Sequence, residues 1–357
     1  MAYTTIDDPS VYFQTAIYTG NGGSSQAVTF NGNSDMQPDW LWLKVRSHSG
    51  NHFAYDSVRG ATKALVPNDT DSEDTSYGYF SSFNSDGFTL GSADNNVNGS
   101  GRTYVGWGWK AGTAFSNDAS STSVGTVDSV GSVNQDAGFS IVSYTNTNQS
   151  ANSGVATIKH GLNTTPNVMI LKDRDATSDW QVFHSSVPTN KYLDLNTTDA
   201  AAVDTNVWNN TAPTSSVFTV GDNSYSNPGN RAMIAYCFAE KQGYSKFGSY
   251  VANGGGADST FVYLGFKPAW IMVKKSSGTQ SWYIGDNKRL GYNPKNENVN
   301  ADTSGTEFSQ DNWDVLSNGF KIKNNGAGVG TDGDTYIFMA FAEQPFVTST
   351  GVPATAR

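Results

Sequence analysis

The apolar residues of this chain lie in short runs, separated by polar stretches rich in glycine, serine, threonine and asparagine. Three of these runs begin with a proline and end with a lysine, at residues 38–44, 166–172 and 268–274. Proline cannot donate to a β-ladder but is tolerated as the first residue of a strand, and the large apolar residues after it suit a buried strand. We therefore expect three buried strands, each of which ends where the lysine introduces a charge.

A second apolar run follows each of these strands at a nearly constant distance. These runs cover residues 104–109, 233–238 and 336–341, and their fourth residues lie 69, 70 and 71 residues after the corresponding proline. Similarity within a chain at a spacing of this size indicates tandem modules. The pattern predicts that the chain contains three copies of one structural unit.

No window of eleven or more residues shows the 3.6-residue period of a helix, whereas many short apolar runs alternate with Gly- and Asn-rich turns. This pattern is typical of sandwiches and jelly rolls. We expect an all-β chain of three tandem β-sandwich modules of the jelly-roll or concanavalin-like type. The expected boundaries are an N-terminal lead-in at 1–13, module 1 at 14–110, a linker at 111–137, module 2 at 138–240, module 3 at 244–345 and a polar tail at 346–357.

The expected linker is rich in Ser, Thr and Gly and carries only isolated apolar side chains. Such a segment buries too little surface to offset the entropy lost when a packed element is ordered. We therefore interpret it as a connection, with an extended strand laid along a neighbouring module as the alternative.

The composition changes the expected partners more than the expected fold. The chain has 22 Lys and Arg against 32 Asp and Glu, and no run of basic residues, which argues against a nucleic-acid partner. No stretch approaches the roughly 18 apolar residues of a membrane span, so we expect no membrane insertion. The opening residues 1–8 have neither a cationic region nor an apolar core, and no export signal is expected.

Two carboxylates stand at equivalent places in the first and third modules. Asp56 and Asp286 are each followed three residues later by an arginine, Arg59 and Arg289, whereas the second module has His184 at this place. A glycosidase needs two carboxylates that face one bond, and no second carboxylate recurs at a matching spacing. We interpret the two pairs as salt bridges within turns and expect no catalytic residue.

The sequence also gives little support for a metal or cofactor site. The single cysteine, Cys237, excludes an intrachain disulfide and a Cys-based zinc site. The acidic stretch 69–73 resembles the start of a calcium loop but lacks the glycine that an EF-hand requires at its sixth position. We interpret it as a solvated acidic loop, with a looser calcium site as the alternative, and expect no cofactor.

The aromatic residues offer another kind of site. There are 9 Trp, 17 Tyr and 19 Phe, and sugar rings stack on exposed aromatic faces. Trp208, Tyr292 and Trp313 lie outside the repeated strands, in loops that differ between the modules, and binding residues often lie on loops. We take these three residues as candidates for glycan stacking, with packing inside their own module as the alternative.

Several stretches of the chain carry a likeness to a known group of proteins. They are residues 4–14, 58–63, 247–250, 265–274, 316–321 and 340–343. Through them the chain resembles virion proteins of tailed phages, most of all those abundant in marine and cyanobacterial phages. The resemblance spans nearly the whole chain. It implies a structural or appendage protein of the phage particle, and it brings no catalytic residues with it.

The resemblance and the composition together give the expected function. We expect a non-enzymatic tail-fibre or appendage protein that assembles in the host cytoplasm, becomes part of the virion and contributes to assembly and host attachment. Its expected partners are other virion proteins, further copies of itself in a homo-oligomer, and a host-surface glycan. The alternatives are a capsid decoration (cement) protein, a glycan-binding lectin-like module and, as a third class, a polysaccharide depolymerase.

Overall fold

The computed structural model describes residues 3–146, 154–254, 259–289, 293, 295–326 and 328–355. The expected all-β class is confirmed, because strands in several sheets make up the regular structure. Across these described ranges the helices are two short ones, the 3-10 helix η1 (Pro9–Val11) and α1 (Ala119–Thr122). None of the described helices is long and apolar enough to cross a membrane.

The strands fall into three sets that follow the sequence repeat. Repeat 1 (13–109) contains β1 (Phe13–Thr19), β2 (Gln26–Val28), β3 (Trp40–Val45), β4 (His52–Asp56), β5 (Phe80–Phe83), β6 (Phe88–Leu90) and β7 (Thr103–Trp109). Repeat 2 (139–238) contains β10 (Phe139–Thr145), β11 (Ala156–Lys159), β12 (Val168–Asp173), β13 (Gln181–His184), β14 (Lys191–Asp194), β15 (Ala202–Val203), β16 (Val217–Val220) and β17 (Ala232–Phe238). Repeat 3 (245–345) contains β18 (Ser245–Val251), β19 (Phe261–Tyr263), β20 (Phe266–Lys275), β21 (Trp282–Asp286), β22 (Lys295–Asn300), β23 (Phe308–Leu316), β24 (Gly319–Ile322) and β25 (Thr335–Pro345).

The same four antiparallel strands form the centre of each repeat, in the orders β1-β7-β3-β4, β10-β17-β12-β13 and β18-β25-β20-β21. Their registers agree residue by residue. The first apolar run pairs with the second at Trp40 and Trp109, at Val168 and Phe238, and at Trp270 and Phe341. The three proline-led runs therefore hold the same place in their sheets.

The outer layers of the repeats differ from one another. Repeat 1 has a separate sheet in the order β2-β6-β5, and repeat 2 has the pair β11-β16. In repeat 3 the sheet continues without a break through β22, β23, β24 and β19. The central sheet is thus the shared feature, and the outer strands vary around it.

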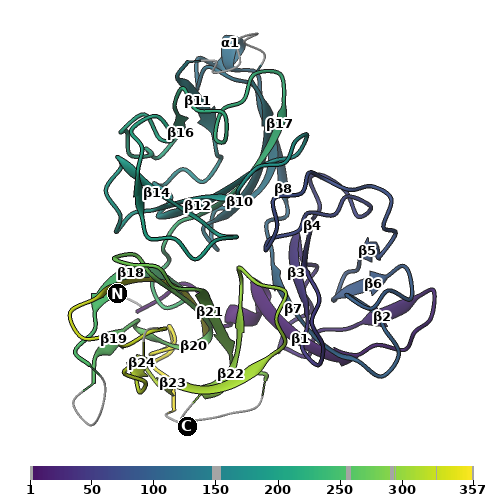
Figure 1. Ribbon diagram of the computed structural model, residues 1–357, viewed down its shortest axis with the longest axis vertical. Coiled ribbons are helices and arrows are strands. Elements are labelled where there is room, and N and C mark those ends of the chain that lie inside the picture. The colour runs from purple at the N-terminus through teal and green to yellow at the C-terminus, as the bar shows by residue number, and fades with distance from the viewer. Residues whose placement is uncertain are drawn as a thin grey trace.

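The central strands are buried on both faces, which explains why their sequences are continuous apolar runs instead of alternating ones. In β3, Trp40 and Trp42 belong to a large central cluster, whereas Leu41 and Leu43 pack into the core of repeat 1. In Figure 1 the three repeats form lobes around a common centre. The face of each sheet that carries Trp40 and its counterparts therefore packs against the other two repeats.

The expected linker is an ordered arm. It contains β8 (Thr113–Asn117), the helix α1 and β9 (Ser129–Asn134). Strand β9 pairs antiparallel with β10, from Asn134 opposite Phe139 to Ser129 opposite Tyr144, and β8 pairs with β9. The interpretation as a plain connection is wrong and its alternative, the extended strand, is correct, because ladder hydrogen bonds compensate for the few apolar side chains.

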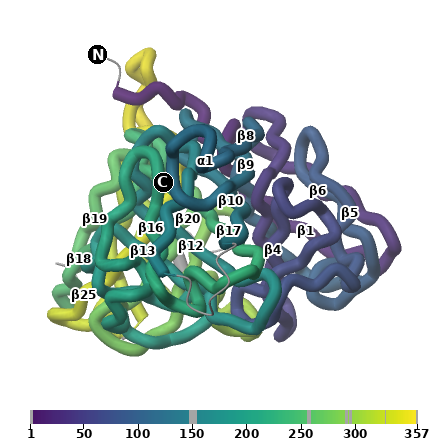
Figure 2. The backbone as a smooth tube through the Cα atoms, turned by 90° about the horizontal axis from the view of Figure 1, so that it is seen from above, coloured from purple at the N-terminus to yellow at the C-terminus, as the bar shows by residue number. Residues whose placement is uncertain are grey.

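The two ends of the described chain meet on one side of the molecule. Figure 2 shows the purple N-terminal stretch close to the yellow C-terminal chain. The backbone nitrogen of Ser349 donates to Asp7 Oδ1 at 2.6 Å, and Tyr3 Oη donates to the carbonyl of Gly265 at 2.7 Å. The N-terminal lead-in is therefore fastened both to repeat 3 and to the chain that follows it.

Candidate functional site

The repeats meet at three interfaces with the same geometry. We call these interfaces seams and name each by the two repeats that it joins: 2–1, 1–3 and 3–2. At the 2–1 seam, Ser178 and Glu73 donate their backbone N–H groups to the carbonyls of Thr70 and Arg174, at 2.9 and 2.8 Å. At the 1–3 seam, Gly50 N donates to Ser304 O at 2.8 Å and Glu307 N donates to Arg46 O at 3.0 Å. At the 3–2 seam, Gln280 N donates to Thr198 O at 2.7 Å and Ala201 N donates to Ser276 O at 3.1 Å. The seams therefore form a ring in which each repeat docks onto the next in the same register.

The lysine that ends each proline-led run lies in these seams. Lys44, Lys172 and Lys274 are buried, and each donates from Nζ to a carbonyl of the neighbouring repeat, on Ser304, Thr70 and Thr198, at 3.2, 3.0 and 2.8 Å. Burial lowers the pKa of each lysine to about 8. Each strand ends one residue after its lysine, so the charge does lie near the end of the strand, but it is buried and links two repeats.

Beside each lysine, a ring nitrogen of a tryptophan or histidine forms a further hydrogen bond to the neighbouring repeat. Trp180 Nε1 donates to Val66 O at 3.0 Å, and Trp282 Nε1 donates to Asp194 O at 2.9 Å. At the 1–3 seam the same place is held by His52, whose Nε2 lies 3.0 Å from Asn300 O. His52 Nδ1 accepts a hydrogen bond from Trp42, and burial holds the pKa of this imidazole well below its usual range. The ring is therefore neutral and donates through Nε2.

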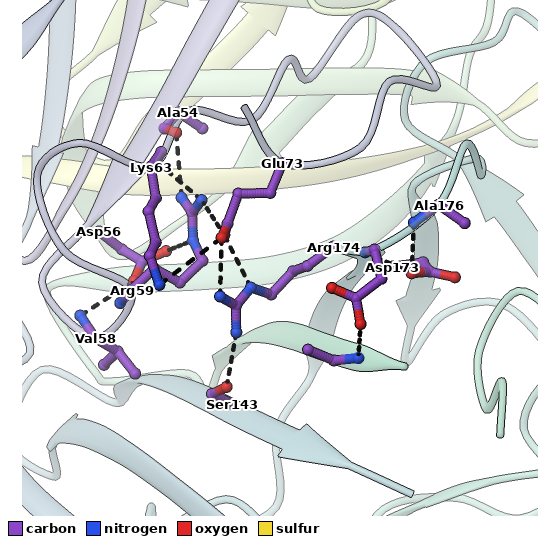
Figure 3. A network of polar contacts seen from close by, with 12 residues as sticks. Ala54, Asp56, Val58, Arg59, Lys63, Glu73, Ser143, Asp173, Arg174 and Ala176 are labelled. Atoms are coloured by element: carbon purple, nitrogen blue, oxygen red, sulfur yellow. Dashed lines mark hydrogen bonds and ion pairs between the residues drawn. The ribbon is translucent and has the colours of Figure 1, made fainter. Parts of the chain in front are cut away.

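A buried ionic network closes the 2–1 seam (Figure 3). Asp56 and Arg59 of repeat 1 form an ion pair, and both side chains are fully shielded from water. Arg59 Nη1 also lies 3.2 Å from the carboxylate of Glu73. Arg174 of repeat 2 donates to both oxygens of Glu73, at 2.8 and 2.9 Å. Tyr236, also of repeat 2, donates its hydroxyl to Asp56 at 2.7 Å. Burial alone would raise the pKa of Glu73, but the bonds from Arg174 and the charge of Arg59 outweigh it and lower the pKa.

The 1–3 seam repeats this network with counterpart residues. Asp286 and Arg289 form the shielded pair, and Arg289 reaches Glu307 at 3.2 Å. Arg46 of repeat 1 binds Glu307 through Nε and Nη2, and Trp107 Nε1 takes the place of the tyrosine hydroxyl by donating to Asp286 at 3.0 Å. The two Asp–Arg pairs are thus salt bridges after a strand, as expected, and they also support contacts between repeats.

The 3–2 seam lacks the ionic network. His184 stands in place of the aspartate, Ala201 in place of the glutamate and Ser276 in place of the second arginine. His184 Nε2 lies 3.1 Å from the carbonyl of Phe338 in repeat 3, and its Nδ1 accepts the backbone N–H of Ser186 at 3.1 Å. Both ring nitrogens of the neutral imidazole are therefore satisfied, and a second proton would break the bond to Ser186.

This arrangement makes the 3–2 seam sensitive to acid. Burial lowers the pKa of His184 to about 4, below the 6.5 of an unfolded histidine, so its contribution to stability is present above pH 6.5 and is lost as the pH falls towards 4. We expect the wild type to lose about 2 kcal/mol more than the His184→Gln variant between pH 7 and pH 4.5, in urea unfolding at both pH values. The control His48→Gln, at an exposed position, should show the wild-type pH dependence, and an equal loss in all three proteins contradicts the prediction.

The residues proposed for glycan stacking do not form a surface. Trp208 and Trp313 are both 0% exposed, so the expectation that they are accessible is wrong. The Trp208 ring lies 5.7 Å from that of Phe183, and the Trp313 ring lies 6.2 Å from that of Phe320. Each tryptophan packs beneath the outer strands of its own repeat, as the alternative interpretation holds. Tyr292 lies outside the described residues.

The acidic stretch 69–73 is not the solvated loop that its composition indicates. Glu73 and the carbonyl of Thr70 lie in the 2–1 seam, while Asp71 remains exposed. Within the described ranges, no three His, Cys, Asp or Glu side chains gather closely enough to hold a metal ion. Cys237 is buried in the core of repeat 2, where burial raises the pKa of its thiol to about 12.

Local patterns in the sequence do not predict the seams. Their partners come from different repeats, and hydrophobic periodicity carries no information on such contacts. A signal was present in the repeat, because lysine recurs at the same place three times and Arg46 and Arg174 share one place. Charged residues that recur inside buried runs of a tandem array indicate contacts between the copies.

The comparisons with known proteins add a family without an assigned role. No curated protein and no solved structure matches the chain. Residues 8–345, which cover all three repeats and the arm, match a family described as a domain of unknown function. The chain belongs to this family, Domain of unknown function (DUF7483).

Proposed function

We propose that this protein is a non-enzymatic structural component of a phage particle, built from three tandem β-sandwich modules at 14–110, 138–240 and 244–345. Its role is that of a tail fibre or appendage that contributes to assembly and host attachment. The sequence resemblance to virion proteins of tailed phages is the source of this assignment, and the seams support it on physical grounds.

One observation carries the non-enzymatic part of the proposal. Two clusters of buried charged side chains join the repeats: Asp56, Arg59 and Glu73 bind one another and Arg174, and the counterparts at the 1–3 seam do the same. Catalytic groups need to face a substrate, whereas these groups are saturated by each other. Such a network suits a protein whose task is to keep its shape.

The chain also has features that suit a particle protein with other subunits as partners. Its net charge is −10, and strands β1 and β18 lie at sheet edges with one ladder partner each. An open edge can pair with a strand of another chain. The proposal therefore includes other virion proteins and further copies of the chain as partners, in the virion.

Immunogold labelling of purified particles tests the location. We expect mass spectrometry to find the chain in the particles and gold to mark the tail or its appendages. Gold on the head surface would favour the role of a capsid decoration protein over that of a tail fibre. A chain that is absent from purified particles and remains a monomer in solution contradicts the proposal in both forms.

A glycan role and a depolymerase role are separated by two further measurements. A glycan array with the purified chain tests host-surface sugar binding directly. Incubation with host envelope polysaccharide should release no reducing ends, because a non-enzymatic protein cleaves no glycosidic bond. Release of reducing ends above the level of a heat-denatured sample contradicts the assignment.

A further inference from the structure

A cavity of about 570 Å³ lies between repeats 1 and 3. One side is formed by Phe13, Gln14 and Thr15 at the start of β1, and the facing side by residues 342–344 at the end of β25. The lead-in residues 7–10 line it as well. Its size is in the range of a binding site for a small molecule or a short peptide segment.

The internal repeat shows what fills the equivalent space elsewhere in the molecule. The counterparts of Phe13–Thr15 are Phe139–Ile141 of β10, since Phe13 pairs with Trp109 as Phe139 pairs with Phe238. Residues 139–141 are covered by residues 132–134 of the arm strand β9.

The side of the cavity formed by residues 342–344 also has a counterpart at the 2–1 seam. Gly112, the counterpart of Gln344, donates its backbone N–H to Ser132 of the arm at 2.9 Å. At the 2–1 seam, an extended strand thus lies between the two surfaces that enclose the cavity at the 1–3 seam. The cavity has the place and the neighbours of a strand site.

The groups beside the cavity are those that a strand would use. Strand β1 is the edge of its sheet and pairs with β7 alone. Thr15 is 3% exposed, and its Oγ1 has no hydrogen-bond partner within the described ranges. The side-chain amides of Asn33 and Gln344, which also line the cavity, make no hydrogen bond within the same ranges. These groups supply donors and acceptors for a peptide backbone.

The charges beside the cavity distinguish between occupants. Three carboxylates line it, on Asp7, Asp8 and Glu343, against the single ammonium group of Lys288. Lys267 pairs with Glu343 at 3.2 Å. Asp7 and Asp8 accept hydrogen bonds from Ser349 and Ser10, and within the described ranges neither has a cationic partner. The arm of a second copy carries Asp118, Asp128 and Asp136 and no Lys or Arg, so it would be repelled.

We propose that this cavity is a docking site for an extended, positively charged segment of a different protein, which adds to the edge of β1 as β9 adds to β10. Addition of a strand to the edge of a sheet is a common mode of peptide recognition: main-chain hydrogen bonds supply the affinity and the flanking charges supply the selectivity. The inference does not depend on the location of the chain in a particle.

A labelled peptide tests this site on the full chain. The probe has the sequence of residues 127–135 with Asp128→Lys and Gln135→Lys, and it keeps Gly131, whose place in β9 leaves only 2.1 Å between an added Cβ and Ile141 O. We expect saturable one-to-one binding by fluorescence anisotropy, at least tenfold tighter than that of the unmodified peptide at low salt, with the ratio shrinking at high salt. Hydrogen exchange of the β1 amides should slow when the probe is added.

Variants of the chain and of the probe complete the test. Asn33→Trp, which fills the cavity, should weaken binding at least tenfold, whereas Val203→Trp, at a 68% exposed position of β15, should leave it unchanged. A probe with Ser132→Pro and Val133→Pro should bind weakly, because successive N–H groups of a strand point to opposite sides and one of these two must face β1. No saturable binding, equal binding by Asn33→Trp, or equal binding of the proline probe overturns the proposal. Self-association of the chain with protection of β1 also overturns it, because the occupant would then be a second copy.

Discussion

Replacement of Arg59 by methionine should lower the free energy of unfolding by about 3 to 5 kcal/mol. The guanidinium is buried and binds Asp56, Glu73 and the carbonyl of Ala54. Removing it leaves the Asp56 carboxylate, whose side chain is fully shielded, with the Tyr236 hydroxyl as its remaining side-chain partner. A buried charge without its counter-ion is among the most costly defects in a folded protein.

Urea unfolding followed by tryptophan fluorescence measures this effect. The matched control is Lys63→Met: Lys63 lies 3.9 Å from the same glutamate but its side chain is 37% exposed, so we expect a loss below about 1 kcal/mol. A double-mutant cycle with Glu73→Gln should give a coupling energy of about 0.5 to 3 kcal/mol, because the two side chains share one network. Equal effects of Arg59→Met and Lys63→Met contradict the importance of burial at this seam.

Much of the fold can be read from the sequence because its signals are local. The proline-led runs and their partners at a spacing of 69 to 71 residues give the central strands and their common place in each repeat. The alternation inside these runs holds further information: Leu41 and Leu43 face one core while Trp40 and Trp42 face another. A run that is apolar on both faces indicates a strand between two packed layers.

The contacts between the repeats could not be predicted from local pattern. Lys44 has the sequence context of a strand end, yet its ammonium group is bound by carbonyls of its own repeat and of repeat 3. Glu73 lies in a loop whose acidic composition predicts exposure to solvent, but its carboxylate binds Arg174 of repeat 2. The position of Trp208 and Trp313 outside the repeated strands favours exposure, but Trp208 lies in the core of repeat 2 and Trp313 lies in the large cluster that includes Trp40.

The ring of seams implies that the three repeats do not unfold independently. Two seams carry ionic networks and the third carries His184, but all three keep the same backbone bonds and the same lysine. The arrangement has the character of a closed trimer of one module, formed within a single chain. In a closed ring, separation of one repeat from the others breaks two seams at once, which raises the cost of partial opening.

The centre of the ring is an aromatic cluster in which counterpart residues of the three repeats meet. The rings of Trp109, Phe238 and Phe341 lie 6.4, 5.7 and 5.9 Å apart, and all three are at most 1% exposed. The indole nitrogens of Trp109 and Trp270 have no hydrogen-bond partner within the described ranges, so this centre is held by packing. Its stability should therefore depend on the volume that the rings fill.

Phe341→Ala should cost about 3 to 5 kcal/mol in the free energy of unfolding, because it leaves a cavity among rings from all three repeats. Phe341 contacts Phe13 and Trp109 of repeat 1 and Phe238 of repeat 2. The control Tyr225→Ala removes an aromatic ring that is 45% exposed and should change stability by less than about 0.5 kcal/mol.

Amide hydrogen exchange in Phe341→Ala then distinguishes a shared centre from a local one. If the ring of seams couples the repeats, exchange should speed up by a similar factor in β7, β17 and β25, because these three strands carry the central rings. Faster exchange confined to β25 would show that the cavity weakens repeat 3 alone and that the repeats open independently. Since β7 and β17 belong to repeats other than the mutated one, their response measures the coupling between the repeats directly.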